Sequence, residues 1–236
     1  MNRFPPLHDL SRVPAGPVLV VAPHPDDEIL GCGGAIALHV RRGDRVHVAL
    51  VTAGEGGGDP LRRLEESRAA ANLLGRTDVT TLGAKDGAVA QDAGLAERLA
   101  AVVARERPVV VYAPSPFELH PDHLATLRAT AAALRNARPQ PRLLLYEVNT
   151  ETPASFLLDI TPVAQRKREA LATFGSQRGL VDLVEKCDAR ARARTVNVDL
   201  PAVTHAEGFL ELAPAAVDDA LQRVDALRVA LGLPAG

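Results

Sequence analysis

The sequence predicts an α/β fold, with a Rossmann-like, mostly parallel sheet, helices on both faces and C-terminal additions. The first observation is that short β-branched runs alternate with longer amphipathic stretches, a pattern typical of βαβ units. The second is that these runs are continuously apolar, which indicates strands covered on both faces. Because the 236 residues show no linker and no internal repeat, we expect residues 1–236 to form a single domain.

Each element of the first two thirds follows from this alternation. The apolar run at 17–22 predicts a strand, and a proline-rich turn ends it. The stretch at 28–42 predicts a helix with small residues along one face, closed by Gly43. The same reasoning predicts further strands at 45–52, 79–82, 109–113 and 142–148, and further helices at 61–74, 93–105 and 124–135.

The last third of the chain is less regular. We expect a strand at 156–160 and an edge strand within 203–212. Helices are expected at 162–174, 182–193 and 215–231.

Composition excludes several classes of protein. A net charge of −2 gives no bulk electrostatic case for nucleic acid or anionic membrane. The two cysteines, Cys32 and Cys187, are too few for a disulfide scaffold or a multi-thiolate zinc site. Nothing reads as a targeting segment or a membrane span, so we expect a cytoplasmic protein. A metal site would therefore use imidazole and carboxylate ligands.

The loops that follow the strands carry the chemistry. Ligands of an open parallel sheet bind outside the carboxyl ends of its strands. The loop after the first strand contains His24 followed by three consecutive carboxylates at 26–28. The loop after the fourth strand contains His120, Asp122 and His123. We expect these two loops to converge at one edge of the sheet.

Such a cluster suits a metal ion. His24 and Asp27, three residues apart, can chelate one ion, and a histidine from the second loop would complete two imidazoles and one carboxylate. That set suits Zn²⁺ with an open position for water, and it leaves Fe²⁺ open. Asp26 would then be free to act as a base. Acidic residues at a helix N-terminus are also common caps, but caps alone do not explain the histidines.

Two motifs, P-H-P-D-D-E at 23–28 and H-P-D-H at 120–123, resemble those of the LmbE-like, or PIG-L, family of zinc-dependent de-N-acetylases. Weaker similarities follow in the family's order along most of the chain. They are R-L-E-E at 63–66, D-G at 86–87, D-I-T at 159–161, Lys167, S-Q at 176–177 and A-E-G-F at 206–209.

The resemblance implies a set of roles. It implies that His24, Asp27 and His123 hold the metal and that Asp26 is the general base. His120 would be the second catalytic histidine, and Asp122 would orient and charge it. The implied reaction is attack by metal-bound water on the amide carbonyl of an N-acetylglucosamine-type conjugate, which releases acetate.

The resemblance also suggests a substrate pocket. Arg63 and Asp86 are candidates to contact the amino-sugar substrate, although each has an ordinary structural explanation as a helix or turn residue. The glycine-rich stretch 54–58 is either a lid or a plain loop. The chain departs from the family pattern at Phe174 and Glu118, and we expect both at the pocket rim, with Asn149 at its wall.

Other functions stay open at this point. The same site would serve an amidase that cleaves a thiol S-conjugate. A non-catalytic sugar- or metal-binding protein would not need Asp26 and His120. A dinucleotide-binding oxidoreductase is disfavoured, because the loop after the first strand lacks the G-x-G-x-x-G spacing. The sequence leaves the oligomeric state open, including a homo-oligomer.

Overall fold

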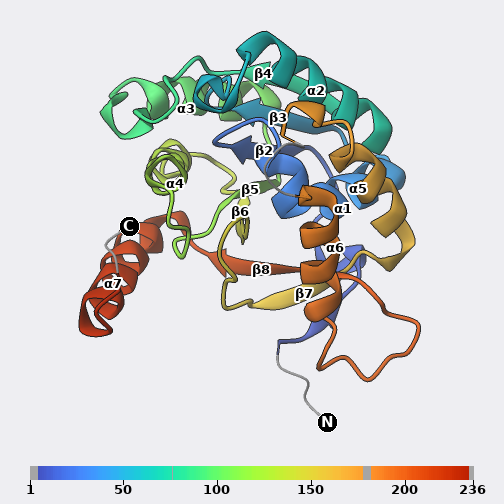
Figure 1. Cartoon of the computed structure of the whole chain (residues 1–236). Coiled ribbons are helices and arrows are strands. Elements are labelled where there is room, and N and C mark those ends of the chain that lie inside the picture. The colour runs from blue at the N-terminus through green and yellow to red at the C-terminus, as the bar shows by residue number, and fades with distance from the viewer. Residues whose placement is uncertain (1–4, 76, 178–181, 234–236) are drawn as a thin grey trace.

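A computed structural model describes residues 5–75, 77–177 and 182–233, and its strands form one eight-stranded sheet (Figure 1). The strands are β1 (Leu7–His8), β2 (Val18–Ala22), β3 (Val46–Leu50), β4 (Thr77–Thr81), β5 (Val110–Pro114), β6 (Arg142–Tyr146), β7 (Phe156–Asp159) and β8 (Ala206–Leu212). Their order across the sheet is β1-β7-β8-β6-β5-β2-β3-β4. The predicted α/β fold with a mostly parallel sheet is therefore confirmed.

The direction in which strands are added reverses at β2. This strand pairs in parallel with β3 on one side and with β5 on the other. β4 continues the first direction and β6 the second. The crevice between the carboxyl ends of β2 and β5 is thus a topological switch point, where ligands of such sheets bind.

Helices cover both faces of the sheet (Figure 1). One face packs against α1 (Asp27–Arg42), α2 (Pro60–Leu74), α5 (Ala164–Leu171) and α6 (Leu183–Ala193). The other packs against α3 (Leu95–Glu106), α4 (Pro121–Leu134) and α7 (Val217–Ala230). Successive residues of β2 serve the two faces in turn: Val20 belongs to the first core and Val21 to the second. No helix among the described residues is both long enough and apolar enough to cross a membrane.

The prediction of an edge strand near the C-terminus is wrong. β8 lies inside the sheet, between β7 and β6, and runs antiparallel to both. The charged residues of this segment favour an exposed strand, but Glu207 is buried and fully partnered. The short strand β1, which pairs with β7, was not predicted.

Helix α1 is interrupted at Cys32, whose φ of −142° and ψ of 24° are not helical. The freed backbone N–H groups of Gly34 and Ala35 donate to the Glu207 carboxylate at 2.7 and 2.8 Å. The Lys167 ammonium donates to Glu207 at 2.8 Å and to the carbonyl of Leu30 at 3.0 Å. Side chains from β8 and α5 therefore replace the helical hydrogen bonds that the interruption removes, and they hold the first turn of α1 in place.

Candidate active site

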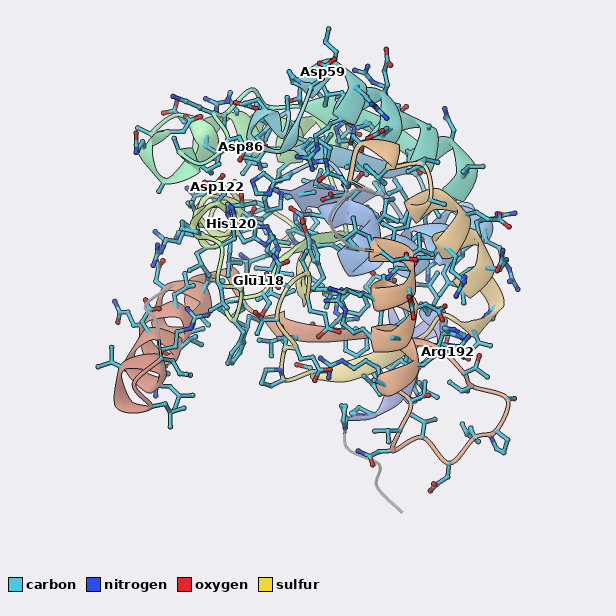
Figure 2. The ribbon with its side chains drawn as sticks, viewed as in Figure 1. Asp59, Asp86, Glu118, His120, Asp122 and Arg192 are labelled. Carbon is cyan, nitrogen blue, oxygen red and sulfur yellow. The ribbon has the colours of Figure 1, made fainter. Side chains whose placement is uncertain are left out.

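A cavity of about 470 Å³ opens at the carboxyl ends of the central parallel strands. Loops that follow β2, β3, β4, β5 and β6 all contribute to its wall, as the switch-point topology predicts. In Figure 2 the labelled side chains of Asp86, His120, Asp122 and Glu118 gather beside α4. The residues that line the cavity are His24, Asp26, Asp27, Leu30, Gly56, Gly57, Arg63, Asp86, His120, His123, Val148, Asn149, Gln177 and Leu183.

The structure brings the three predicted metal ligands together. Nδ1 of His24 lies 3.2 Å from Oδ2 of Asp27, and Nε2 of His123 lies 3.3 Å from the same oxygen. The three donor atoms all lie within 4.8 Å of one another. His24 and Asp27 come from the turn between β2 and α1, and His123 comes from the first turn of α4. The chain thus has a His-His-Asp site at the switch point.

The ring nitrogen of each histidine that faces away from Asp27 lies close to another carboxylate. Nε2 of His24 lies 3.1 Å from Asp86 and 3.2 Å from Asp122. Nδ1 of His123 lies 3.2 Å from Glu118. Such partners fix the tautomer and the ring orientation of metal-ligating histidines.

The electrostatics of the site favour positive charge. Burial lowers the pKa of His24, but its hydrogen bond to Asp27 and the charge of that residue outweigh burial and raise the pKa to about 9. Burial likewise lowers the pKa of His123, and Asp27 with Glu118 raises it to about 10. The raised pKa values show that the carboxylates around the two buried imidazoles favour positive charge at this point of the cavity. Two imidazoles and one carboxylate are also the donor set of a divalent transition metal, so the residues fit such an ion.

Asp26 stands beside this group in a strained conformation. Its φ of 116° is one that non-glycine residues rarely adopt, and such strain is typical of functional sites. Its backbone N–H donates to Glu28 at 3.0 Å, and its carboxylate accepts from Arg63 at 3.2 Å. Burial raises the pKa of Asp26 well above its usual value, the charge of Asp27 adds to the rise, and Arg63 opposes it. A carboxylate with a raised pKa is suited to accept a proton near neutral pH.

His120 caps the N-terminus of α4. Its Nδ1 accepts a hydrogen bond from the backbone N–H of Asp122 at 3.2 Å, so a neutral His120 carries its proton on Nε2. The Asp122 carboxylate accepts from the backbone N–H groups of Gly87 at 2.7 Å and Val89 at 3.1 Å, and its remaining contact is with His24. The resemblance implies that Asp122 orients and charges His120, but only the backbone N–H of Asp122 bonds to His120, and its carboxylate faces His24. Burial and the charges of His24 and His123 lower the pKa of His120.

The two candidate substrate contacts both line the cavity, and both are tied into its wall. Arg63 is 5% exposed; besides Asp26, it donates to the carbonyls of Gly54 at 2.9 Å and Pro25 at 2.7 Å. Asp86 accepts from the backbone N–H of Gly56 at 2.9 Å. The glycine-rich stretch 54–58 is thus hydrogen-bonded to the side chains of Arg63 and Asp86, which favours a fixed wall over a lid.

Two expectations for the pocket rim are wrong. Phe174 is 1% exposed and packs in the core between the sheet and its helices. Glu118 is 0% exposed and lies behind His123. Asn149 does line the cavity, as expected. The sequence analysis assigned no place in the site to Gln177, although the S-Q pair at 176–177 could have indicated one. The Gln177 side-chain amide donates to the carbonyl of Gly57 at 3.1 Å.

The fold and the site together define an α/β protein with a His-His-Asp metal site at a switch point. Residues 19–134 match the family described as PIG-L, GlcNAc-PI de-N-acetylase. A probable N-acetyl-alpha-D-glucosaminyl L-malate deacetylase of Bacillus subtilis is 32% identical over 183 residues, which cover 68% of this chain and 82% of that protein. The chain belongs to the PIG-L family.

Other comparisons show how widely the fold is used. A diacetylchitobiose deacetylase of Thermococcus kodakarensis is 32% identical over 130 residues, which cover 50% of this chain and only 47% of that protein. The crystal structure of a conserved Thermus thermophilus protein is 33% identical, with a TM-score of 0.75 over 84% of this chain and 94% of that one. A 4-carboxy-2-hydroxymuconate hydratase of Pseudomonas putida is 26% identical, with a TM-score of 0.72 over 84% and 96%.

Proposed function

We propose that this protein is a zinc-dependent deacetylase that removes the N-acetyl group from an N-acetylglucosamine-type amino-sugar conjugate. One observation carries the proposal: two imidazoles and a carboxylate converge beside the buried carboxylate of Asp26 in a member of a de-N-acetylase family. Zn²⁺ is the ion we propose, because two imidazoles, one carboxylate and an open position form a hydrolytic zinc site. Fe²⁺ is the alternative that the same donors accept.

His24, Asp27 and His123 would hold the ion, which supplies Lewis-acid chemistry and lowers the pKa of a water molecule toward ~7. Asp26 takes one proton from the attacking water. Its raised pKa and its place in the cavity wall support this role. General-base catalysis of this kind contributes typically about 10²- to 10⁴-fold.

His120 presents the other polar group. Its Nδ1 is occupied by the backbone N–H of Asp122, so Nε2–H is the donor left for the cavity. That donor stabilises the negative charge that forms on the acetamide oxygen as the water oxygen bonds to the carbonyl carbon. When the carbon–nitrogen bond breaks, the nitrogen receives the proton held by Asp26. The products are acetate and a free amino sugar.

We propose two further roles on the cavity wall. Arg63 positions Asp26, because its guanidinium joins the Asp26 carboxylate to two backbone carbonyls of the wall. Asp86 faces the cavity from the loop after β4 and accepts a hydrogen bond from a sugar hydroxyl. The malate and chitobiose conjugates named for the two curated relatives define the range of sugar conjugates to be tried.

The experiment is a measurement of acetate and primary amine released by zinc-loaded protein. The substrate panel contains N-acetylglucosamine glycosides with neutral and anionic aglycones, and an amide of a thiol S-conjugate. We expect acetate and amine in equal amounts from at least one glycoside. Hydrolysis of the thiol conjugate alone would favour the amidase alternative, and folded, zinc-loaded protein that releases no acetate from any glycoside would refute the proposal.

A further inference from the structure

We infer that Glu118 is a positioning residue that joins the metal ligand His123 to the wall of the substrate cavity. The inference rests on the proposed metal centre, and it gives a role to a residue that was wrongly expected at the pocket rim. Glu118 follows β5 and precedes α4, and Figure 2 shows it on the same side of the molecule as His120 and Asp122. It is completely buried.

The Glu118 carboxylate forms an ion-pair contact on one side and accepts hydrogen bonds on the other. On one side, Oε2 lies 3.2 Å from Nδ1 of His123. On the other, Oε1 accepts from the backbone N–H of Val148 at 2.7 Å and of Asn149 at 3.1 Å. The Asn149 side-chain amide donates to Oε2 at 3.3 Å. A buried carboxylate is costly without partners, and here every contact is with a donor.

These contacts act on both halves of the site. A carboxylate at Nδ1 keeps the His123 proton on that nitrogen, so the lone pair of Nε2 would be free for the proposed ion, beside the Asp27 oxygen that lies 3.3 Å from Nε2. Val148 and Asn149 are themselves residues of the cavity wall after β6. One side chain therefore sets the orientation of a proposed metal ligand and the position of Val148 and Asn149 in the cavity wall.

Helix α7 fixes the position of the backbone at Glu118. Arg228 of α7 is 6% exposed, and its guanidinium donates to the carbonyls of Phe117 and Glu118, both at 2.9 Å. The backbone that carries Glu118 is thus held between α7 and the β6 end of the sheet. This arrangement is rigid on both sides, as the positioning of a metal ligand requires.

The substitution E118Q separates this role from simple packing. An amide has one acceptor oxygen, and the short contact with Val148 holds that oxygen on the wall side. The amide NH₂ then faces His123 Nδ1, which favours the tautomer with the proton on Nε2 and blocks that nitrogen as a ligand. We expect the zinc Kd, measured by competition with a chromophoric chelator, to rise about 10- to 100-fold. At saturating zinc, KM should stay close to that of the wild type.

The matched control is E147Q. Glu147 is also a buried carboxylate at the end of β6. It accepts from the backbone N–H of Thr152 at 3.0 Å and from Arg194, and within the described part of the chain none of its hydrogen bonds involves a residue of the cavity wall. This variant should lose stability and keep the wild-type zinc Kd. A third variant, E118A, leaves the wall N–H groups unpaired as well, so it should raise both the zinc Kd and KM.

The outcomes discriminate among the possibilities. If E118Q binds zinc as tightly as the wild type, or if E147Q weakens zinc binding equally, the inference is wrong. If wild-type protein binds no zinc at all, the proposed metal centre itself fails. If wild-type protein binds zinc without deacetylating any substrate, the zinc Kd values still test Glu118 independently of the proposed reaction.

Discussion

Asp26 combines two properties that a structural residue rarely combines, a φ of 116° and a buried carboxyl group with a raised pKa. The strain is maintained by the Glu28 carboxylate on its backbone N–H and by Arg63 on its side chain. Asp26 lies next in sequence to a proposed metal ligand without being one. A substitution at Asp26 can therefore remove the proposed base while all three proposed metal ligands stay in place.

We predict that Asp26→Asn keeps the metal and loses turnover. Asparagine tolerates positive φ nearly as well as aspartate, so the turn should fold, but an amide does not accept the proton of water. The expected loss in kcat is about 10²- to 10⁴-fold. Steady-state kinetics and elemental analysis measure the two effects. Full activity in this variant would show that the base is another group.

Arg63 gives the second prediction at this scale. Lysine carries a point charge and does not bridge the three acceptors that the planar guanidinium joins. We expect Arg63→Lys to lower kcat about 100-fold through misplacement of Asp26, with a smaller change in KM. The neighbouring Arg62→Lys is the control, because Arg62 is exposed and pairs at the surface with Glu66. A change confined to KM would instead assign Arg63 to substrate binding.

The proposed metal ligands and the proposed base could be predicted from the sequence, whereas the role of Glu118 could not. His24 and Asp27 are three residues apart, and their loop and that of His123 both follow parallel strands, so topology alone brings them together. Glu118 depends on side-chain contact with Val148, thirty positions away, and no spacing rule encodes that contact. Glu118 was expected at the pocket rim, and a charged side chain in a loop is normally exposed, but the structure buries it.

At the scale of elements, the first turn of α1 determines where the proposed base and ligand stand. Gly31 lies against the ring of Tyr146, and a Cβ at Gly31 would come within 2.1 Å of Cδ2 of that ring. Tyr146 has no room to move, because it is fully buried and its hydroxyl donates to the carbonyl of Val21 at 2.9 Å. The close approach therefore requires glycine at this position.

We predict that Gly31→Ala destabilises the fold by about 1–3 kcal/mol through overpacking, although alanine favours helix over glycine. Urea denaturation measures the free energy of unfolding. Gly175→Ala is the control, because its Cβ would meet no atom closer than 3.5 Å, and its stability should stay near that of the wild type. Equal stability of Gly31→Ala and the wild type would contradict the packing described for α1.

Hydrophobic periodicity predicted most elements, and it failed where tertiary contacts replaced local rules. The central strands are buried at every position, so their apolar runs are plain in the sequence. The edge strand expected within 203–212 is β8, whose apolar residues are interrupted by Glu207 and Glu211. The buried contacts of Glu207 with Lys167, 40 residues away, and with Gly34 at the interruption of α1, 173 residues away, explain the difference.

At the scale of the whole molecule, the sheet should be most stable at its centre. All five residues of β2 are buried, and β2 has hydrogen-bonded neighbours on both sides. β4 is an edge strand, and its pattern is half-buried and exposed. We predict that the amide hydrogens of β2 and β5 exchange only through global unfolding, while those of β4 exchange faster. Native-state hydrogen exchange measures these rates. Equally slow exchange in β4 would contradict this gradient.

The most direct test of the proposed function is the rate of acetate release as metal-free protein is titrated with Zn²⁺. If the His-His-Asp site is the catalytic centre, the rate on an accepted N-acetylglucosaminide should rise linearly and level off at one equivalent of zinc. The same titration of Asp26→Asn should bind one equivalent with almost no acetate released. A rate that is unchanged by zinc, or already at its maximum in the metal-free protein, would contradict the assignment.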